Sequence, residues 1–199
     1  MWARLATACV LLAGFCAGCT ARITPPAHLT NPVSVYVADY GRHSSIILPT
    51  GGPNLIEYTY GDWQLYAQNR YRWYIGFTKL LLTEQGAMGR RTIEFVANEQ
   101  DLRKRVWAKR LIKIEVEHDL AASLLSELET MYNSRIETQI YNAPVTTYFV
   151  QHDSRYWLMN NCNHATAEYL RRLGCDVRGC TVLSGFKVRP PGRTIEPEP

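Results

Sequence analysis

Three short segments near the start of the chain limit its fold more than any other feature. Residues 33–39, 43–48 and 55–60 each alternate or cluster apolar residues in the pattern of a β-strand. Gly41 and the turn-forming residues 49–54 separate them. Connections this short join neighbouring strands only in antiparallel pairs. The sequence therefore predicts an antiparallel meander.

Helical and extended patterns alternate through the rest of the chain. Leucines at helical spacing after Asp119 predict a helix capped by that aspartate, and residues 162–173 predict a second helix ended by Gly174. The remaining expectations are a short helix within 75–91 that breaks at Gly86 and Gly89, a basic helix at 101–109, and strands at 92–97, 111–116 and within 136–150. With 199 residues, of which 46% are hydrophobic, the chain fits one core. The fold class predicted is α+β, with an antiparallel sheet packed against helices.

The N-terminus has the pattern of a targeting segment. A basic start is followed by the apolar run 5–15, which is too short to cross a bilayer, so residues 1–18 are interpreted as a signal peptide. Residues 16–19 (Cys-Ala-Gly-Cys) resemble a bacterial lipobox, except that Cys16 stands where leucine is usual. That resemblance implies a fatty-acylated Cys19, such as one carrying palmitate, and an outer-membrane lipoprotein facing the periplasm. Plain secretion into the periplasm is the alternative.

The domain limits follow from this interpretation. Residues 19–31 are expected to form an unstructured tether, residues 32–188 one domain, and the Pro-rich residues 189–199 a disordered tail. The formal net charge of +4 is modest and spread along the chain, which argues against a nucleic-acid partner. In an oxidising compartment Cys175 and Cys180 are close enough in sequence to form a disulfide that leaves Cys162 free, and two buried free thiols are the alternative.

The residues that carry chemistry surround Cys162. A cysteine at the start of a helix has its thiolate stabilised by the helix dipole and by free backbone amides. The same amides can donate hydrogen bonds to the oxyanion of a tetrahedral intermediate. Asn161 is a further candidate donor to the oxyanion. A nucleophilic thiol needs a base, and His43 opens an early strand after a glycine turn. The sequence therefore predicts a Cys162–His43 pair.

The order and motifs of these residues resemble a known protein group. Asn161-Cys162-Asn163-His164 and Arg42-His43 followed by small and aliphatic residues are similar to the motifs of circularly permuted papain-fold proteins of the NlpC superclass, which include lecithin:retinol acyltransferase. More narrowly, the chain resembles an uncharacterised family of bacterial lipoproteins found near urease loci. The resemblance covers residues 33 to about 173 and implies a permuted papain-like fold with a cysteine nucleophile and a histidine base.

Such sites have a third polar residue that orients the histidine. Glu57, on the strand after His43, is the first choice, and Asp62 is the reserve, with capping of the next helix as its other interpretation. His164 is expected to make a supporting contact. A metal site built from Cys162, His164 and His152 is disfavoured because paired cysteines and an HExxH motif are missing. No cofactor is expected.

These observations predict a thiol hydrolase or acyltransferase of the cell envelope that forms an acyl-cysteine intermediate. A lipid ester, a peptidoglycan amide or an acylated protein are the substrate classes considered. Two other functions stay open: a non-catalytic binding or scaffold lipoprotein of the same fold, and a thiol-redox role for Cys175 and Cys180. The redox role is disfavoured because the spacing is not Cys-x-x-Cys.

Overall fold

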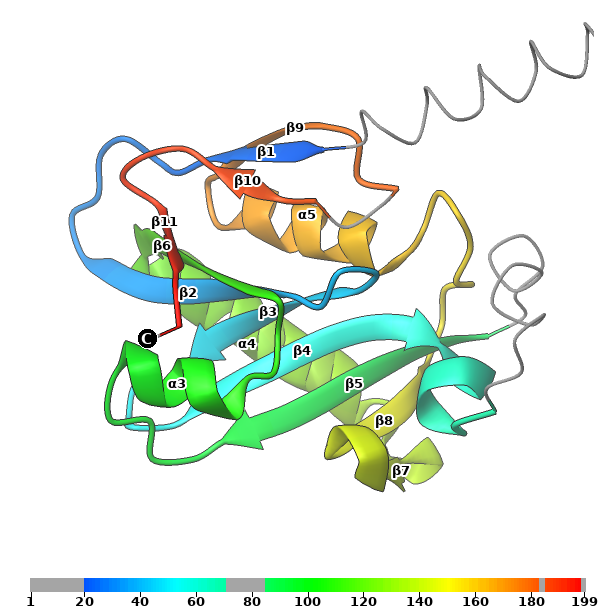
Figure 1. Cartoon of the computed structure of the whole chain (residues 1–199). Helices are drawn as coiled ribbons and strands as arrows, with labels where there is room; N and C mark the ends of the chain where they lie inside the picture. The colour runs from blue at the N-terminus through cyan, green and yellow to red at the C-terminus, as the bar shows by residue number, and fades with distance from the viewer. Residues whose placement is uncertain (1–19, 71–84, 183–184, 198–199) are drawn as a thin grey trace, which may run out of the picture.

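A large antiparallel sheet forms the centre of the molecule (Figure 1). The computed structural model describes residues 20–70, 85–182 and 185–197. Within these residues the sheet has the strand order β11-β6-β2-β3-β4-β5-β8-β7. The strands are β2 (Pro32–Asp39), β3 (Ser44–Pro49), β4 (Leu55–Asp62), β5 (Gly86–Ile93), β6 (Arg110–Glu117), β7 (Ile140–Asn142), β8 (Thr147–His152) and β11 (Arg193–Ile195). The predicted meander is its centre, since β3 pairs with both β2 and β4.

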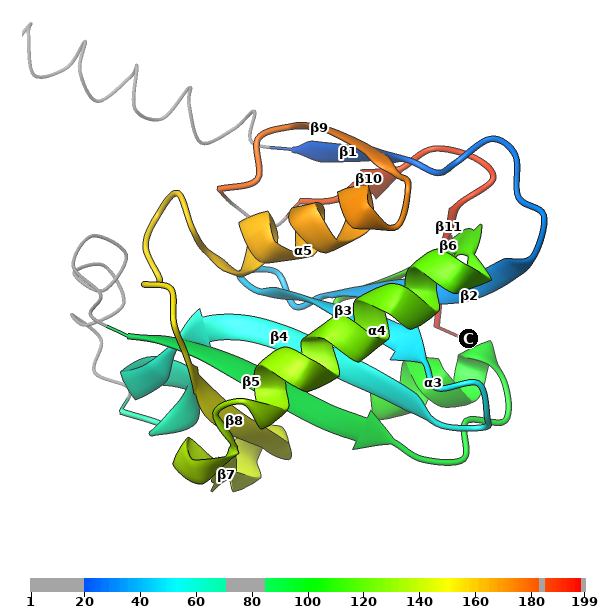
Figure 2. The ribbon, with the colours of Figure 1, turned by 180° about the vertical axis from the view of Figure 1, so that it is seen from behind.

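Helices lie on both faces of this sheet, and a second, smaller sheet lies on the far side of one of these helices. α4 (His118–Asn133) crosses one face and α3 (Glu99–Arg105) lies on the other (Figures 1 and 2). α5 (Cys162–Arg172) lies between the large sheet and a small sheet with the order β10-β1-β9, formed by β1 (Ala21–Thr24), β9 (Asp176–Gly179) and β10 (Lys187–Val188). One-turn helices η1 (Trp63–Ala67), η2 (Ile136–Thr138) and η3 (Ala143–Val145) complete the described elements. None of the helices described is long and apolar enough to span a membrane.

The two faces of β2 enter two different cores. Val35 and Val37 pack in the core under α4 and α5, whereas Tyr36 and Ala38 pack in the core under α3. All four side chains are at most 8% exposed. The alternation seen in the sequence therefore belongs to a strand that is covered on both faces.

β5 corrects one expectation of the sequence analysis. Gly86 and Gly89 lie in a strand that extends to Ile93, whereas the predicted strand was 92–97; residues 75–84, where the short helix was predicted, lie outside the described residues. A Cβ atom at Gly89 would lie 2.5 Å from Thr59 Cγ2 and 2.6 Å from Phe149 Cε1. The glycine thus lets neighbouring side chains approach the strand backbone closely.

Residues 20–31 and 189–197, which were predicted to be unstructured, each contain a short strand. In the expected tether, β1 pairs with β9 and β10, and its Ala21 and Ile23 are fully buried in the main core. In the expected tail, β11 pairs with β6 and buries Ile195. Short apolar strands at chain ends become ordered when they complete a sheet edge and cover a core.

The predicted helix after Asp119 forms, but its start differs. α4 begins at His118, and its N-cap residue is Glu117, which makes no side-chain capping bond. Asp119 lies in the first turn, where its charge still suits the helix dipole. Leu124 and Leu128 are buried as the helical spacing predicted, whereas Leu120 is 42% exposed.

Candidate active site

Cys162 is the first residue of α5, and Asn161 holds that end of the helix. Asn161 Oδ1 accepts hydrogen bonds from the amides of Asn163 (2.9 Å) and His164 (3.1 Å). Its side-chain amide donates to the carbonyls of Leu158 and Val182. Asn161 is therefore the N-cap of α5 and has no donor left for an oxyanion, which corrects its predicted role. Of the first three backbone amides of the helix, only that of Cys162 does not donate to the Asn161 side chain.

His43 approaches the sulfur from the strand side. Gly41, with a φ of +93°, makes the turn after β2, and His43 directly precedes β3. The turn places the carbonyl of Arg42 4.0 Å from Cys162 Sγ. Nε2 of His43 bonds to the hydroxyl of Thr59 on β4. Because this bond occupies Nε2, the buried Nδ1 is the nitrogen left for proton exchange with the sulfur.

The two groups change each other's ionisation. Burial alone would raise the pKa of the Cys162 thiol, but the nearby charge of His43 outweighs burial and lowers that pKa. Burial alone would lower the pKa of His43, but the nearby charge of the Cys162 thiolate raises it. Both shifts favour an imidazolium–thiolate pair, which is the reactive form of a cysteine nucleophile.

Tyr156 is a third polar group at the sulfur. Its hydroxyl lies 3.8 Å from Cys162 Sγ, and the side chain is 7% exposed. Burial and the charge of Cys162 raise the pKa of the phenol, so it keeps its proton at neutral pH. A protonated phenol here can donate to the thiolate or to an oxyanion formed beside it.

Two side-chain bonds hold α5 against β3, so that the pair is fixed by secondary structure. Ser44 Oγ donates to Asn163 Oδ1 at 2.8 Å and bonds to Thr166 Oγ1 at 3.0 Å. All three side chains are at most 2% exposed. Because Ser44 follows His43 and Asn163 follows Cys162, these bonds set the relative position of the base and the nucleophile.

Glu57 does not contact the ring nitrogen of His43, and Thr59 takes the orienting place expected for it. The Glu57 carboxylate accepts from Tyr40 Oη at 2.6 Å, from the hydroxyl of Ser45, and from Arg91 in an ion pair with Nε at 2.9 Å. The reason is the register of β4. Glu57 and Thr59 share one face of the strand, and Thr59 is two residues nearer the His43 turn.

The other predicted site residues have supporting roles. Asp62 caps η1 through a 2.8 Å bond from the Leu65 amide, which agrees with its structural interpretation. The ring of His164 lies 3.3 Å from Asn161 Oδ1 and not at the sulfur. Burial lowers the pKa of His164.

The predicted Cys175–Cys180 disulfide is absent. Cys175 is a buried free thiol that packs in the main core. Cys175 follows the end of α5 and points into the core, so its side chain cannot reach Cys180 beyond β9. Burial raises the pKa of Cys175 to about 12. The two free thiols of the described residues thus lie at opposite ends of α5.

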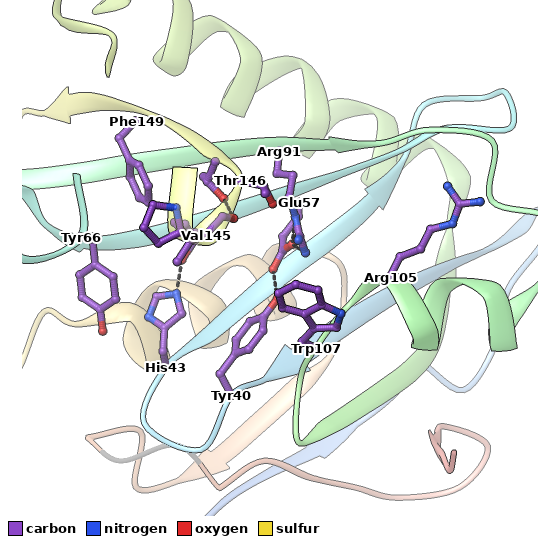
Figure 3. A pocket seen from close by; sticks show the side chains of 13 residues that line it. Tyr40, His43, Glu57, Tyr66, Arg91, Arg105, Trp107, Val145, Thr146 and Phe149 are labelled. Carbon is purple, nitrogen blue, oxygen red and sulfur yellow. Dashed lines mark hydrogen bonds and ion pairs between the residues drawn. The ribbon is translucent and has the colours of Figure 1, made fainter. Parts of the chain in front are cut away.

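A cavity of about 440 Å³ opens on the other side of His43 (Figure 3). Most of its wall is apolar or aromatic, with the Glu57–Arg91 ion pair set into it. Tyr66, whose ring centre lies 4.9 Å from that of His43, adjoins the imidazole. Cys162 is 1% exposed and does not line the cavity, so His43 separates the cavity from the sulfur. The remaining lining residues are Tyr40, Thr59, Arg105, Trp107, Pro144, Val145, Thr146, Thr147 and Phe149.

Sequence reasoning missed Thr59, Tyr156, Ser44 and Asn163. Strand alternation offered a signal for Thr59, since residues two apart on β4 share a face with Glu57. Tyr156 had no such signal, because its loop has no period that places a side chain. Of the aromatic residues between 63 and 74, Trp63 and Tyr66 fall on η1, and Tyr71, Trp73 and Tyr74 lie outside the described residues.

Comparison of the chain with family models, with curated proteins and with solved structures finds no match.

Proposed function

We propose that this protein is a thiol hydrolase or acyltransferase in which Cys162 attacks an ester or amide carbonyl and His43 exchanges the protons. The observation that carries the proposal is the position of Cys162, at the first residue of α5 and against the turn that carries His43, where each group shifts the pKa of the other toward a thiolate beside an imidazolium. Perturbed ionisation of two facing groups is characteristic of catalytic sites.

The proposed reaction has two steps. The Cys162 thiolate adds to the carbonyl carbon, the carbonyl oxygen becomes an oxyanion, and the Cys162 amide and Tyr156 hydroxyl stabilise it. The C–O or C–N bond then breaks, and Nδ1–H of His43 protonates the departing oxygen or nitrogen, leaving a thioester on the sulfur. In the second step His43 takes a proton from water or an acceptor, which attacks the thioester and releases the thiolate.

Thr59 has a defined part in this cycle. An imidazolium donates from both ring nitrogens, so Thr59 Oγ1 accepts from Nε2 while Nδ1 faces the sulfur. This bond keeps the ring in one orientation through both steps. Thr59 is thus a positioning residue, and Glu57 is part of the neighbouring cavity wall.

We also propose that the domain is a permuted papain-like fold and that the protein acts at the bacterial envelope, tethered to the outer membrane through Cys19. The first part is supported by a base directly before an early strand that packs against a helix beginning with the nucleophile. The second is supported by the N-terminal pattern of a basic start, a short apolar run and Cys19. Metabolic labelling with palmitate, lost in Cys19→Ser, tests the tether.

A trapped intermediate tests the reaction. The protein is mixed with p-nitrophenyl esters of increasing acyl length and with a muropeptide amide, quenched in acid, and analysed by peptide mass spectrometry. We expect an acyl mass on the peptide that contains Cys162, removed by hydroxylamine and missing in Cys162→Ala and His43→Gln. The Cys175→Ala variant is the matched control and should acylate normally.

One observation favours the alternative of a non-catalytic scaffold: Cys162 is almost fully buried. In a scaffold the thiol would pack as a small apolar group. Slow labelling by iodoacetamide with an ordinary thiol pKa, equal in the parent protein and His43→Gln, would establish this alternative and exclude the enzyme.

A further inference from the structure

A basic, tryptophan-bearing surface lies at the mouth of the cavity behind His43. Trp107, in the loop between α3 and β6, is 83% exposed, and both its neighbours are buried, Val106 fully and Ala108 at 4% exposure. An indole this exposed between two anchored residues is held outward by its backbone. Trp107 and Arg105 both line the cavity that His43 also lines (Figure 3).

The loop conformation is fixed by a guanidinium. Arg103 Nη1 donates to the carbonyls of Val106 (3.3 Å) and Ala108 (2.9 Å), and Nη2 donates to that of Lys109 (3.4 Å). These bonds close the loop around the position of Trp107. The indole is therefore exposed because these bonds hold its loop in one conformation, and not because the loop is loosely packed.

Positive charge is concentrated around this tryptophan. Residues 101–113 contain six lysines and arginines, of which Arg110 pairs with Asp39, Lys113 pairs with Glu99 and Glu115, and Arg103 holds the loop carbonyls. Lys104, Arg105 and Lys109 are exposed. Arg105 pairs with Asp101 at 2.8 Å. An exposed indole surrounded by basic side chains matches the interface of an anionic lipid layer, where the ring enters the headgroup region and the cations meet the phosphates.

We propose that the surface formed by Lys104, Arg105, Trp107 and Lys109 docks on an anionic lipid surface. Docking in this orientation brings the mouth of the cavity to the headgroups, because Trp107 and Arg105 belong to both. The surface goes beyond the proposed reaction and does not depend on Cys162. It is also separate from the small sheet at the other end of the molecule, where Arg22 and Lys187 lie (Figure 1).

Vesicle binding tests the proposal with the chain from residue 19 onward carrying Cys19→Ser, which lacks the apolar run 5–15 and cannot be lipidated at that position. Vesicles of phosphatidylcholine with an equal part of phosphatidylglycerol should sediment the protein, those of phosphatidylcholine alone should do so weakly, and salt should weaken binding. Brominated lipids should quench tryptophan fluorescence in the parent and not in Trp107→Phe. The Trp107→Ala variant should bind about tenfold more weakly, and Lys104→Gln with Lys109→Gln about 25-fold, since each lysine near the surface contributes about fivefold.

Matched controls remove the same groups elsewhere. Trp157→Ala, at a tryptophan 48% exposed before α5, and Arg22→Gln with Lys187→Gln on the small sheet should leave binding unchanged. Cys162→Ala should bind as the parent does, so loss of the thiol chemistry and loss of docking are separable. Equal binding by parent and Trp107→Ala, or equally tight binding of soluble poly-glutamate without any change in tryptophan fluorescence, would overturn the proposal.

Discussion

The two ends of α5 each have a buried free cysteine, and the two thiols differ in almost everything except burial. Cys162 at the start of the helix is 1% exposed, and Cys175 just beyond its end is 5% exposed. His43 lowers the pKa of the first, whereas burial raises the pKa of the second to about 12. The N-terminal end also has the positive end of the helix dipole. Burial by itself therefore does not decide whether a thiol is inert, because the polar groups that face the sulfur do.

The largest expected difference is in reactivity between the two thiols. At pH 7 a thiol with a pKa of about 12 is almost fully protonated, so Cys162 should react with iodoacetamide at least about a thousandfold faster than Cys175. Peptide mass spectrometry after timed labelling measures both rates in one sample. Similar rates at the two sites would remove the distinction between the helix ends.

Replacing the base should make Cys162 resemble Cys175. In His43→Gln the thiol loses its cationic partner and keeps its burial, so its pKa should rise above the usual 9.0 and labelling at pH 7 should fall about 100-fold. In the parent protein the labelling rate should rise with pH through a midpoint below 9.0, because the thiolate is the reactive form. A pH profile of labelling for both proteins checks the sign. An unchanged midpoint in His43→Gln would show that His43 does not set the thiol pKa.

The roles of Thr59 and Glu57 should separate. Thr59→Val removes the hydroxyl that orients His43 with little change in volume, and labelling of Cys162 should fall about tenfold with stability nearly unchanged. Glu57→Gln should leave labelling within about threefold but lower the free energy of unfolding by about 2 kcal/mol, because it leaves the Arg91 guanidinium without its carboxylate. Urea unfolding and labelling of each variant measure both effects. The reverse pattern would restore Glu57 as the orienting residue.

The smallest effects should come from the two helix caps. Asn161→Ala removes the N-cap and should cost about 1 kcal/mol of unfolding free energy. At the other end Gly174→Ala forces a side chain onto a φ of +83° and should cost about the same. Only Asn161→Ala should slow Cys162 labelling, by about fivefold, because it loosens the turn that seats the sulfur. An equal change in labelling for both variants would mean that general stability, and not the local cap, controls the thiol.

The elements that carry strong periodicity could be predicted from the sequence. The meander of β2, β3 and β4 and the helices α4 and α5 appear near their expected positions. The glycines of β5 were misleading, because a glycine that breaks a helix and a glycine that lets Phe149 approach a strand have the same appearance in a sequence. The chain ends were also misjudged, since β1 and β11 are too short to show a period and are ordered by the sheets they join.

The sequence by itself determined that a cysteine would begin a helix and that a histidine would begin an early strand, because capping, turns and periodicity are local. Only the tertiary structure decided which groups face the sulfur and the imidazole. Thr59 contacts His43 through the register of β3 and β4, and Tyr156 approaches Cys162 through the path of a loop. Such contacts depend on packing between distant segments, so no local pattern of residues encodes them.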